Sequence, residues 1–505
     1  MYSTQSRSLT EAPLPETEST PSCSIDHIPP EIITQFLLFY LHTCLETRKD
    51  TSYSRVDGQL QSFLRNISLT CKRWRDIITS TPDFWAFVDI QITHGTPSLS
   101  LSQLDKWLER SRQLPLTISF EVHSNTGNTT AEAALRTQAF LQRLMTHLSR
   151  WKDVSLTFPL CKTSSELPAL LTTSGPMTAP ILERLSIDIN RLPGYYRSLE
   201  WMTLLLASCP RLHTFVDKGM TGPVPSHVVP LSQLREITIK RAWSPYQALQ
   251  ILEEMPMLER CRLSLIGDFG PPCDPMICHA KFMEISFYQS GPAFFTYLVA
   301  PNLTELSYHA ISPQSSSFHQ GLLNFLTKTQ GQITSFTIRN LFMKDTELLE
   351  LLPLLSSSLE KLAILTERFT SSADYFRVEN FSKDVVAALT YHEQIPLDRE
   401  KLEKDLFCCP KLQVLRLERC ASENVKDGLI SDMVASRRAP PATDGSSSIS
   451  KLFSFSIMFR YHSHPLDFER LVQMRRQGLM GTTEFGYPSS IHQQNVNLKL
   501  VSGFF

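Results

Sequence analysis

Two stretches of the chain share one pattern: residues 182–190 read LERLSIDIN, and residues 412–420 read LQVLRLERC. In both, apolar residues occupy the first, fourth and sixth positions, and a proline stands two positions before the first, at Pro180 and Pro410. From the fourth to the seventh position apolar and polar residues alternate in both stretches, which is typical of a strand with one buried face. The pattern predicts a strand in each stretch.

The same phrase recurs from residue 150 onward. Its clearest copies begin at Leu182, Leu258, Leu303 and Leu412. Weaker copies begin at Leu212, Leu234, Phe282, Ile333, Leu359 and Leu452. From 182 to 359 the starting positions lie mostly 21 to 30 residues apart. Helical patterns lie between the copies, at residues 196–208, 245–254, 318–328 and 345–355. We therefore expect one strand and usually one helix in each unit.

A strand and a helix at this period resemble a leucine-rich repeat. The two best copies also carry Asn190 or Cys420 at the ninth position, where that family places a small polar side chain that bonds backbone groups inside the turn. The resemblance implies an irregular leucine-rich-repeat solenoid over residues 151–505, with insertions near 366–406 and 421–450. We expect helical pieces at 384–389 and 398–406 in the first insertion. An ordinary parallel α/β fold is the alternative, although its strands would be longer and more uniformly apolar.

Stacked repeats of this kind would place their strands side by side on one concave face, with the residues between the buried positions pointing outward. The charges at these outward positions are mixed, as on many protein-binding surfaces. A solvated face without a partner would look nearly the same. The candidate target-binding residues are Arg184, Glu236, Lys240, Arg260, Arg262, Glu305 and Arg416.

The amino-terminal part of the chain has a different character. Residues 28–41 are apolar almost all round at helical spacing, which exceeds what one packing face needs. A polar loop is expected from His42 to Gln59, and then a second helix over residues 60–80 with Cys71 and Trp74 on its inner side. Part of the first helix should therefore meet a partner.

Three short motifs in this region resemble an F-box when taken in order. They are IPPEII at 28–33, SLTCKRWRDI at 68–77 and STPDFW at 80–85. The long loop after the first helix, WLERS at 107–111 and a strand at 117–122 resemble the F-box proteins of mushroom-type fungi. A three-helix bundle with a purely structural role is the alternative.

These two resemblances together imply fold class α/β, with a small N-terminal helical F-box module followed by the repeats. We expect a disordered tail at 1–24, the module at 25–90 and a connecting segment at 91–150. The resemblance implies that the module docks a Skp-type linker protein and, through it, a cullin, while the repeats hold a target protein for ubiquitin transfer. The implied linker contacts are Ile28, Pro29, Glu31, Ile32, Ile33, Phe36 and Leu37. A scaffold outside any ligase is the alternative function.

Composition argues against several other classes of protein. The chain has 505 residues, with 49 basic against 50 acidic residues, and this balance does not favour a nucleic-acid or anionic-membrane binder. Neither phosphate-binding glycine loops nor the hydrolase motifs GxSxG and HExxH occur. We expect no enzyme activity and no cofactor; a hydrolase site within 366–406 is the remaining enzymatic alternative.

Cysteine and histidine usage also fits a reduced compartment better than a disulfide framework. The eleven cysteines are scattered, which predicts a cytoplasmic or nuclear protein. Cys273, Cys278 and His279 lie close in sequence, as do Cys408 and Cys409, but neither group has zinc-site spacing. His462 and His464 alternate beside Pro465. No metal site and no membrane span are expected.

Overall fold

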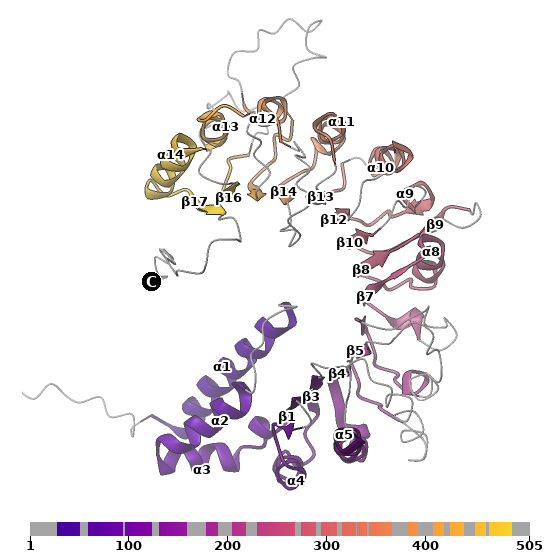
Figure 1. The fold of residues 1–505 in the computed structure, drawn as a ribbon, viewed down its shortest axis with the longest axis vertical. Coiled ribbons are helices and arrows are strands. Elements are labelled where there is room, and N and C mark those ends of the chain that lie inside the picture. The colour runs from indigo at the N-terminus through magenta and orange to yellow at the C-terminus, as the bar shows by residue number, and fades with distance from the viewer. Residues whose placement is uncertain are drawn as a thin grey trace, which may run out of the picture. The chain divides into compact units, whose positions relative to one another are not determined.

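The computed structural model describes the chain in 17 segments (Figure 1). They are residues 28–50, 59–93, 96–123, 131–158, 178–189, 205–218, 230–267, 274–288, 294–310, 316–329, 331–340, 343–365, 381–391, 408–418, 425–438, 450–460 and 464–486. The tail expected at 1–24 lies outside the described residues. The chain divides into two compact units: Met1–Asp89 with Ser102–Leu114, and Ile90–Leu101 with Pro115–Phe505. Within the described segments, no helix combines the length and the apolar character needed to cross a membrane.

The first unit is helical. Its elements are α1 (Pro30–Asp50), α2 (Gln59–Thr70), α3 (Lys72–Ser80), the 3-10 turn η2 (Pro82–Trp85) and most of α4 (Leu101–Arg110). A loop was expected from His42, but α1 continues to Asp50, because residues 42–50 contain good helix formers and neither glycine nor proline. That boundary was therefore wrong.

The single helix expected over residues 60–80 is two helices. The backbone of Cys71 is extended (φ −156°, ψ 169°), and its Sγ accepts a hydrogen bond from the backbone N–H of Trp74 at 3.5 Å. Cys71 thereby caps α3 and ends α2. Cys71 is exposed and Trp74 only half-buried, so the inward placement of both was wrong. Ile78, which was also expected to point inward, is buried, and Ile77 joins it in the core.

Trp85 anchors the end of this unit, as expected for a buried tryptophan. Its Nε1 donates to the carbonyl of Ile78 at 2.8 Å, and its ring meets Trp107 edge to face at 4.8 Å between centroids. The guanidinium of Arg110 lies 4.5 Å from the Trp85 ring centre. Aromatic and cation–π contacts of this kind add to the apolar area that the two tryptophans bury.

The second unit is built on a long, mostly parallel sheet, and the whole chain is mixed α/β. The sheet has 15 strands among the described residues, beginning with β1 (Phe87–Thr93), which pairs antiparallel with β2 (Thr96–Pro97). The strands from β3 to β17 then follow in chain order, apart from β9 (Met276–Ile277) and β11 (Leu298–Val299), which pair with each other. The remaining strands are β3 (Leu116–His123), β4 (Trp151–Phe158), β5 (Arg184–Ile189), β6 (Thr214–Asp217), β7 (Glu236–Trp243), β8 (Arg260–Leu265), β10 (Phe282–Phe287), β12 (Glu305–Ala310), β13 (Ser335–Asn340), β14 (Lys361–Leu365), β15 (Val414–Glu418), β16 (Ser454–Arg460) and β17 (Met480–Gly486).

Helices of the second unit lie along one side of this sheet (Figure 1). They are α5 (Ala131–Met145), α8 (Pro245–Glu253), α9 (Phe294–Tyr297), α10 (Ser316–Lys328), α11 (Asp345–Leu355), α12 (Lys383–Leu389), α13 (Leu429–Arg438) and α14 (Pro465–Arg476), with 3-10 turns η3 (Leu148–Arg150) and η5 (Leu231–Gln233). The helices expected at 245–254, 318–328, 345–355 and 384–389 are confirmed. Of the helix expected at 196–208, residues 205–207 are described and helical, whereas the piece expected at 398–406 lies outside the described residues.

Nine of the ten predicted phrases match the observed strands. In these, the strand begins two residues after the first apolar residue, as at Leu182 and Leu412. The exception is Phe282, which pairs with Arg260 and Glu305 and so points outward. The phrase starts instead at Ala280 and continues through Met283 and Ile285, since a strand pattern of period two fits equally well when moved by two residues.

The sheet also extends beyond the predicted copies. Trp151, Val154 and Leu156 take the three buried positions of one more unit, because Val154 pairs with Leu185 and Leu156 with Ile187. β3 confirms the strand expected at 117–122 and pairs with β4, and β17 adds a strand after the last predicted copy. Asn190 and Cys420, which complete the two best phrases, lie outside the described residues.

Candidate functional site

The predicted linker-binding residues divide into a buried and an exposed group along α1. Ile33 and Leu37 are only 5% and 3% exposed and pack in the core of the first unit with Leu41. Ile28, Ile32 and Phe36 are exposed, the last two at 55% and 66%, as are Pro29 and Glu31. The helix thus buries one apolar stripe and leaves another in solvent.

Two residues that were not among the predicted contacts belong to the exposed stripe. Phe39 is 72% exposed, and Tyr40 is 49% exposed although its ring stacks on Phe63 at 4.9 Å between centroids. Positions four apart on a helix lie on the same face. We call Ile28, Ile32, Phe36, Phe39 and Tyr40 the α1 apolar surface.

The start of this surface is held in place by the unit itself. The carbonyl of Pro29 accepts hydrogen bonds from the backbone N–H groups of Ile32 and Ile33, at 3.1 and 3.2 Å. Arg73 of α3 donates a hydrogen bond to the carbonyl of Ile28. The apolar side chains are therefore presented by an anchored helix end, which lowers the entropic cost of binding.

On the strand face of the second unit, three of the predicted target-binding residues bind one another. Arg262 donates to Glu236 at 2.9 Å and to Glu284 of the next strand at 3.3 Å. Arg184 lies 3.9 Å from both Glu236 and Asp153. This charge ladder, Asp153–Arg184–Glu236–Arg262–Glu284, alternates in sign from β4 to β10.

The other predicted residues of this face are placed differently. Arg416 pairs with Glu418 of its own strand, at 2.7 Å between Nε and Oε1. Arg260 is exposed, and its guanidinium lies 5.6 Å from the centre of the Phe282 ring. Glu305 is exposed and lies opposite Phe282 in the sheet. Lys240 is exposed beside a bulge in β7.

Sequence reasoning missed Glu284 and Phe282, although both lie at the centre of this face. The phrase placed at Phe282 is two residues out of register and therefore counted Phe282 as buried. Glu284 points outward in either register but was not among the predicted contacts. An apolar residue before Met283 at the correct spacing, Ala280, was the available signal. It was weak because alanine is small.

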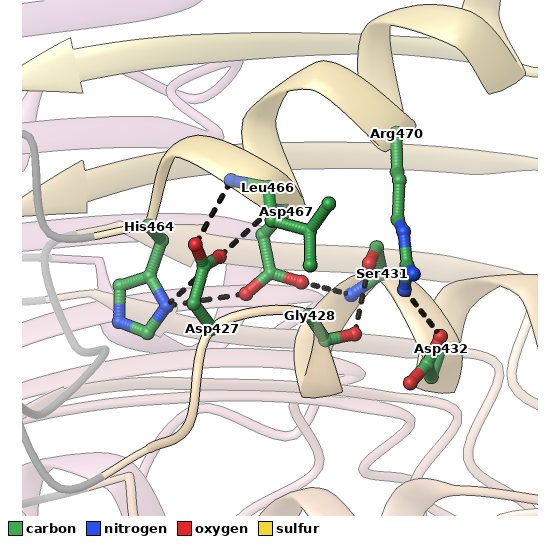
Figure 2. Close-up of polar contacts among 8 residues, drawn as sticks. All are labelled: Asp427, Gly428, Ser431, Asp432, His464, Leu466, Asp467 and Arg470. Carbon is green, nitrogen blue, oxygen red and sulfur yellow. Dashed lines mark hydrogen bonds and ion pairs between the residues drawn. The ribbon is translucent and has the colours of Figure 1, made fainter.

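A third cluster joins α13 to α14 at the far end of the second unit (Figure 2). The side-chain ligand atoms of Asp427, His464 and Asp467 all lie within 4.8 Å of one another, a spacing that could hold a metal ion. His464 Nδ1 lies 3.1 Å from Asp467 Oδ2, and its ring stacks on Phe459. His462, its predicted companion, lies outside the described residues.

The carboxylates of this cluster already serve the two helix ends. Asp427 accepts hydrogen bonds from the backbone N–H groups of Leu466 and Asp467 at 3.0 and 2.9 Å, at the start of α14. Asp467 in turn accepts from the backbone N–H of Ser431 at 2.6 Å, in the first turn of α13. Asp427, which precedes α13, therefore caps the amino-terminal end of α14, and Asp467 of α14 caps the amino-terminal end of α13.

The electrostatics of Asp467 agree with this capping role. Burial by itself would raise the pKa of this carboxyl, but hydrogen bonds from His464, Ser431 and Gly428 outweigh it, and the pKa lies below its ordinary value. The ionised form is thus the one that the fold stabilises. We interpret the cluster as a clasp between α13 and α14.

The cysteines singled out in the sequence lie in apolar surroundings where they are described. Burial raises the pKa of Cys409 to about 12 and that of Cys278 to about 11. Cys408 is buried as well, while Cys273 lies outside the described residues. A raised pKa disfavours the thiolate that metal binding and nucleophilic chemistry require.

Beside Cys408 and Cys409, the side chain of Arg437 is fully buried. It donates three hydrogen bonds to backbone carbonyls, of Leu389 at 2.5 Å, Cys409 at 2.9 Å and Cys408 at 2.7 Å. Burial lowers its pKa to about 10, so the guanidinium is still charged at neutral pH. Arg437 thereby fixes the end of α12 to the start of β15. Within the stretch 366–406, which was suggested for a hydrolase site, the structure describes residues 381–391 alone.

No protein-family model matches the chain, and no curated protein matches it.

Proposed function

We propose that the chain is a substrate-recognition adaptor of a ubiquitin ligase built on a Skp-type linker protein and a cullin. In this proposal the first unit is an F-box module and the second an irregular leucine-rich-repeat solenoid. The observation that carries it is the α1 apolar surface, which lies in the motif IPPEII and the residues directly after it. A small helical unit rarely leaves several large apolar side chains in solvent unless a partner covers them.

The proposed mechanism is tethering. The first unit would hold the linker protein and, through it, the cullin with its ubiquitin-carrying enzyme. The second unit would hold a target protein. Linking the two raises the effective concentration of target lysines at the enzyme, so that the chain itself does no bond chemistry. Such a protein would work in the cytoplasm or the nucleus.

Copurification with a cullin tests this proposal. Ile32→Glu with Phe36→Glu places two charges on the α1 apolar surface, where neither side chain contributes to the core. We expect this variant to lose both the linker protein and the cullin from affinity-purified complexes. Ser62→Glu with Asn66→Glu is the matched control, because it adds the same charges to exposed positions four apart on α2.

The result also separates the ligase from its alternative. If the wild-type chain brought down a linker protein without any cullin, a scaffold outside a ligase would be the better description. If the α1 variant kept its cullin, the first unit would not be the docking module and the proposal would fail.

A further inference from the structure

One row of the strand face carries no carboxylate over six successive strands. It lies toward the carboxyl ends of β6, β7, β8, β10, β12 and β13. Its members are Lys218, Lys240, Ser264, Ser286, His309 and Arg339, and we call them the basic row. The last four are register partners in the sheet, and the two lysines directly follow the paired residues Asp217 and Ile239.

The outward-facing acidic residues of the same strands lie nearer the amino ends, whereas Asp217 at the end of β6 is fully buried. Glu236, Glu284 and Glu305 occupy the two rows before the basic row, and the first two are engaged with Arg262. The basic row itself ends at Asp188 of β5 on one side and at Leu365 of β14 on the other. Charge is therefore separated along the strands of this face.

The two lysines lie on neighbouring strands, and neither forms an ion pair among the described residues, although Asp188 and Glu284 attract Lys240. Neighbouring strands lie about 4.8 Å apart, so the two ammonium groups can approach each other closely. Within the described part of the chain, the ion pairs of this face join Arg184, Arg262 and Arg416 to acids and leave Lys218 and Lys240 out. The bulge between Ile239 and Ala242 places Lys240 outside the regular ladder, an arrangement that often redirects a side chain.

Two further observations indicate that the cationic groups of the basic row could bind an anion. The pKa of Lys240 lies below its ordinary value first because its ammonium group is partly desolvated, although the residue as a whole is exposed, and second because Lys218 repels it. Asp188 and Glu284 only partly offset these two effects. At the other end of the row, the Nε of Arg339 is buried and has no hydrogen-bond partner among the described residues. A buried donor without a partner costs free energy that a bound acceptor would recover.

We propose that the basic row binds an extended, acidic segment of a partner protein. Six strands at about 4.8 Å span about 24 Å, and an extended chain rises about 3.4 Å per residue, so the segment would be about seven residues long. Carboxylate side chains would meet the lysines at one end and Arg339 at the other. The hydroxyls of Ser264 and Ser286 lie between them.

A protein segment fits this face better than a nucleic acid does. Glu236, Glu284 and Glu305 lie one or two rows away and would repel a backbone that carries a charge at every phosphate. An acidic peptide can place its charges only where the row is basic. The inference rests on the proposed function in that it names the chemistry of the captured target, but it does not depend on the linker protein.

Fluorescence anisotropy with the full-length chain tests the proposal. The probe is a labelled octapeptide of alternating glutamate and serine, compared with an analogue in which glutamine replaces each glutamate. We expect the acidic peptide alone to bind, with an affinity that falls as salt rises. Lys218→Gln with Lys240→Gln should weaken binding about tenfold or more. Lys361→Gln with Lys451→Gln removes the same charge from other exposed positions of the second unit and should leave binding unchanged.

Several results would overturn the proposal. They are an acidic peptide that does not bind the wild-type chain, equal affinities for the two lysine variants, and an oligothymidylate of eight nucleotides that binds more tightly than the peptide through the same lysines. Cullin copurification is measured in parallel on the same variants. If the wild-type chain bound the acidic peptide as predicted but did not copurify with a cullin, the proposed function would be wrong and this inference would still hold.

Discussion

The α1 apolar surface is exposed and the charge ladder of the second unit is half-buried, and the two differ in how far their side chains already have partners within the chain. On α1, Ile32, Phe36 and Phe39 leave more than half of their surface in water and have no polar groups to be solvated. On the strand face, Arg184, Glu236 and Arg262 already bind one another. A partner gains by covering the first surface, whereas on the second it must compete with existing ion pairs.

This difference separates the two surfaces by the kind of contact that each can offer. The α1 apolar surface suits a permanent subunit, because apolar burial is favourable without exact charge matching. The strand face suits a selective partner, because only a ligand with the right charge pattern can replace what the ladder and the basic row already hold. The first unit would then bind the permanent subunit, and the second unit would bind the selective partner.

The largest expected effect is a loss of stability on truncating a buried side chain of α1, compared with an exposed side chain of the same helix. Leu37→Ala removes a side chain that is 3% exposed and should lower the free energy of unfolding by about 2–5 kcal/mol. Phe36→Ala, one residue away but on the exposed stripe, should change it by less than about 0.5 kcal/mol. Urea denaturation followed by circular dichroism measures both. Equal losses would mean that the exposed and buried stripes are wrongly assigned.

A smaller effect is expected at the clasp between α13 and α14. Asp467→Asn should cost about 1–3 kcal/mol at neutral pH, because the buried carboxylate accepts charge-assisted hydrogen bonds that an amide cannot fully replace.

The same substitution should change how stability depends on pH. The folded pKa of Asp467 lies below the ordinary value of 3.8, so its contribution is present above that pH and is lost as the pH falls through the folded value. The difference between the wild-type chain and Asp467→Asn should therefore shrink below about pH 4. Thermal unfolding at several pH values measures it, and a difference that stayed constant down to about pH 2 would contradict the capping role.

The smallest effect is expected at the charge ladder. Glu236→Gln leaves the shape of the side chain but removes the charge that Arg184 and Arg262 share. Because the ladder residues remain partly solvated, we expect a loss of about 1 kcal/mol that diminishes as salt is added. Lys361→Gln, an exposed change in the same face, is the control. A loss of several kcal/mol would show that the ladder is more deeply desolvated than its exposure indicates.

The regular parts of the fold could be predicted because they depend on local pattern. The helix at 345–355 and the strands after Leu182 and Leu412 follow from apolar spacing alone. Register was less secure: Phe282 and Ala280 both fit a period of two, and only the pairing with β8 and β12 distinguishes them. Cys71 separates α2 from α3 by capping α3, and the apolar spacing of residues 60–80 did not reveal this break.

The candidate surfaces were predictable only in part, for a related reason. The all-round apolar character of residues 28–41 indicated an exposed stripe, but which residues formed it depended on where α2 and α3 pack. The basic row requires six strands in register, and the clasp joins Asp427 to a helix that begins only at Pro465. Such contacts between distant segments leave no mark in any single stretch of sequence.

Hydroxyl-radical footprinting of the full-length chain, with and without a purified Skp-type linker protein, tests the division between the two surfaces most directly. Oxidation of Phe36, Phe39 and Tyr40 should fall strongly when the linker is added, while that of Phe282 on the strand face stays unchanged. If the three α1 side chains remained equally reactive, or if Phe282 were protected instead, the assignment of the linker protein to the α1 apolar surface would be contradicted.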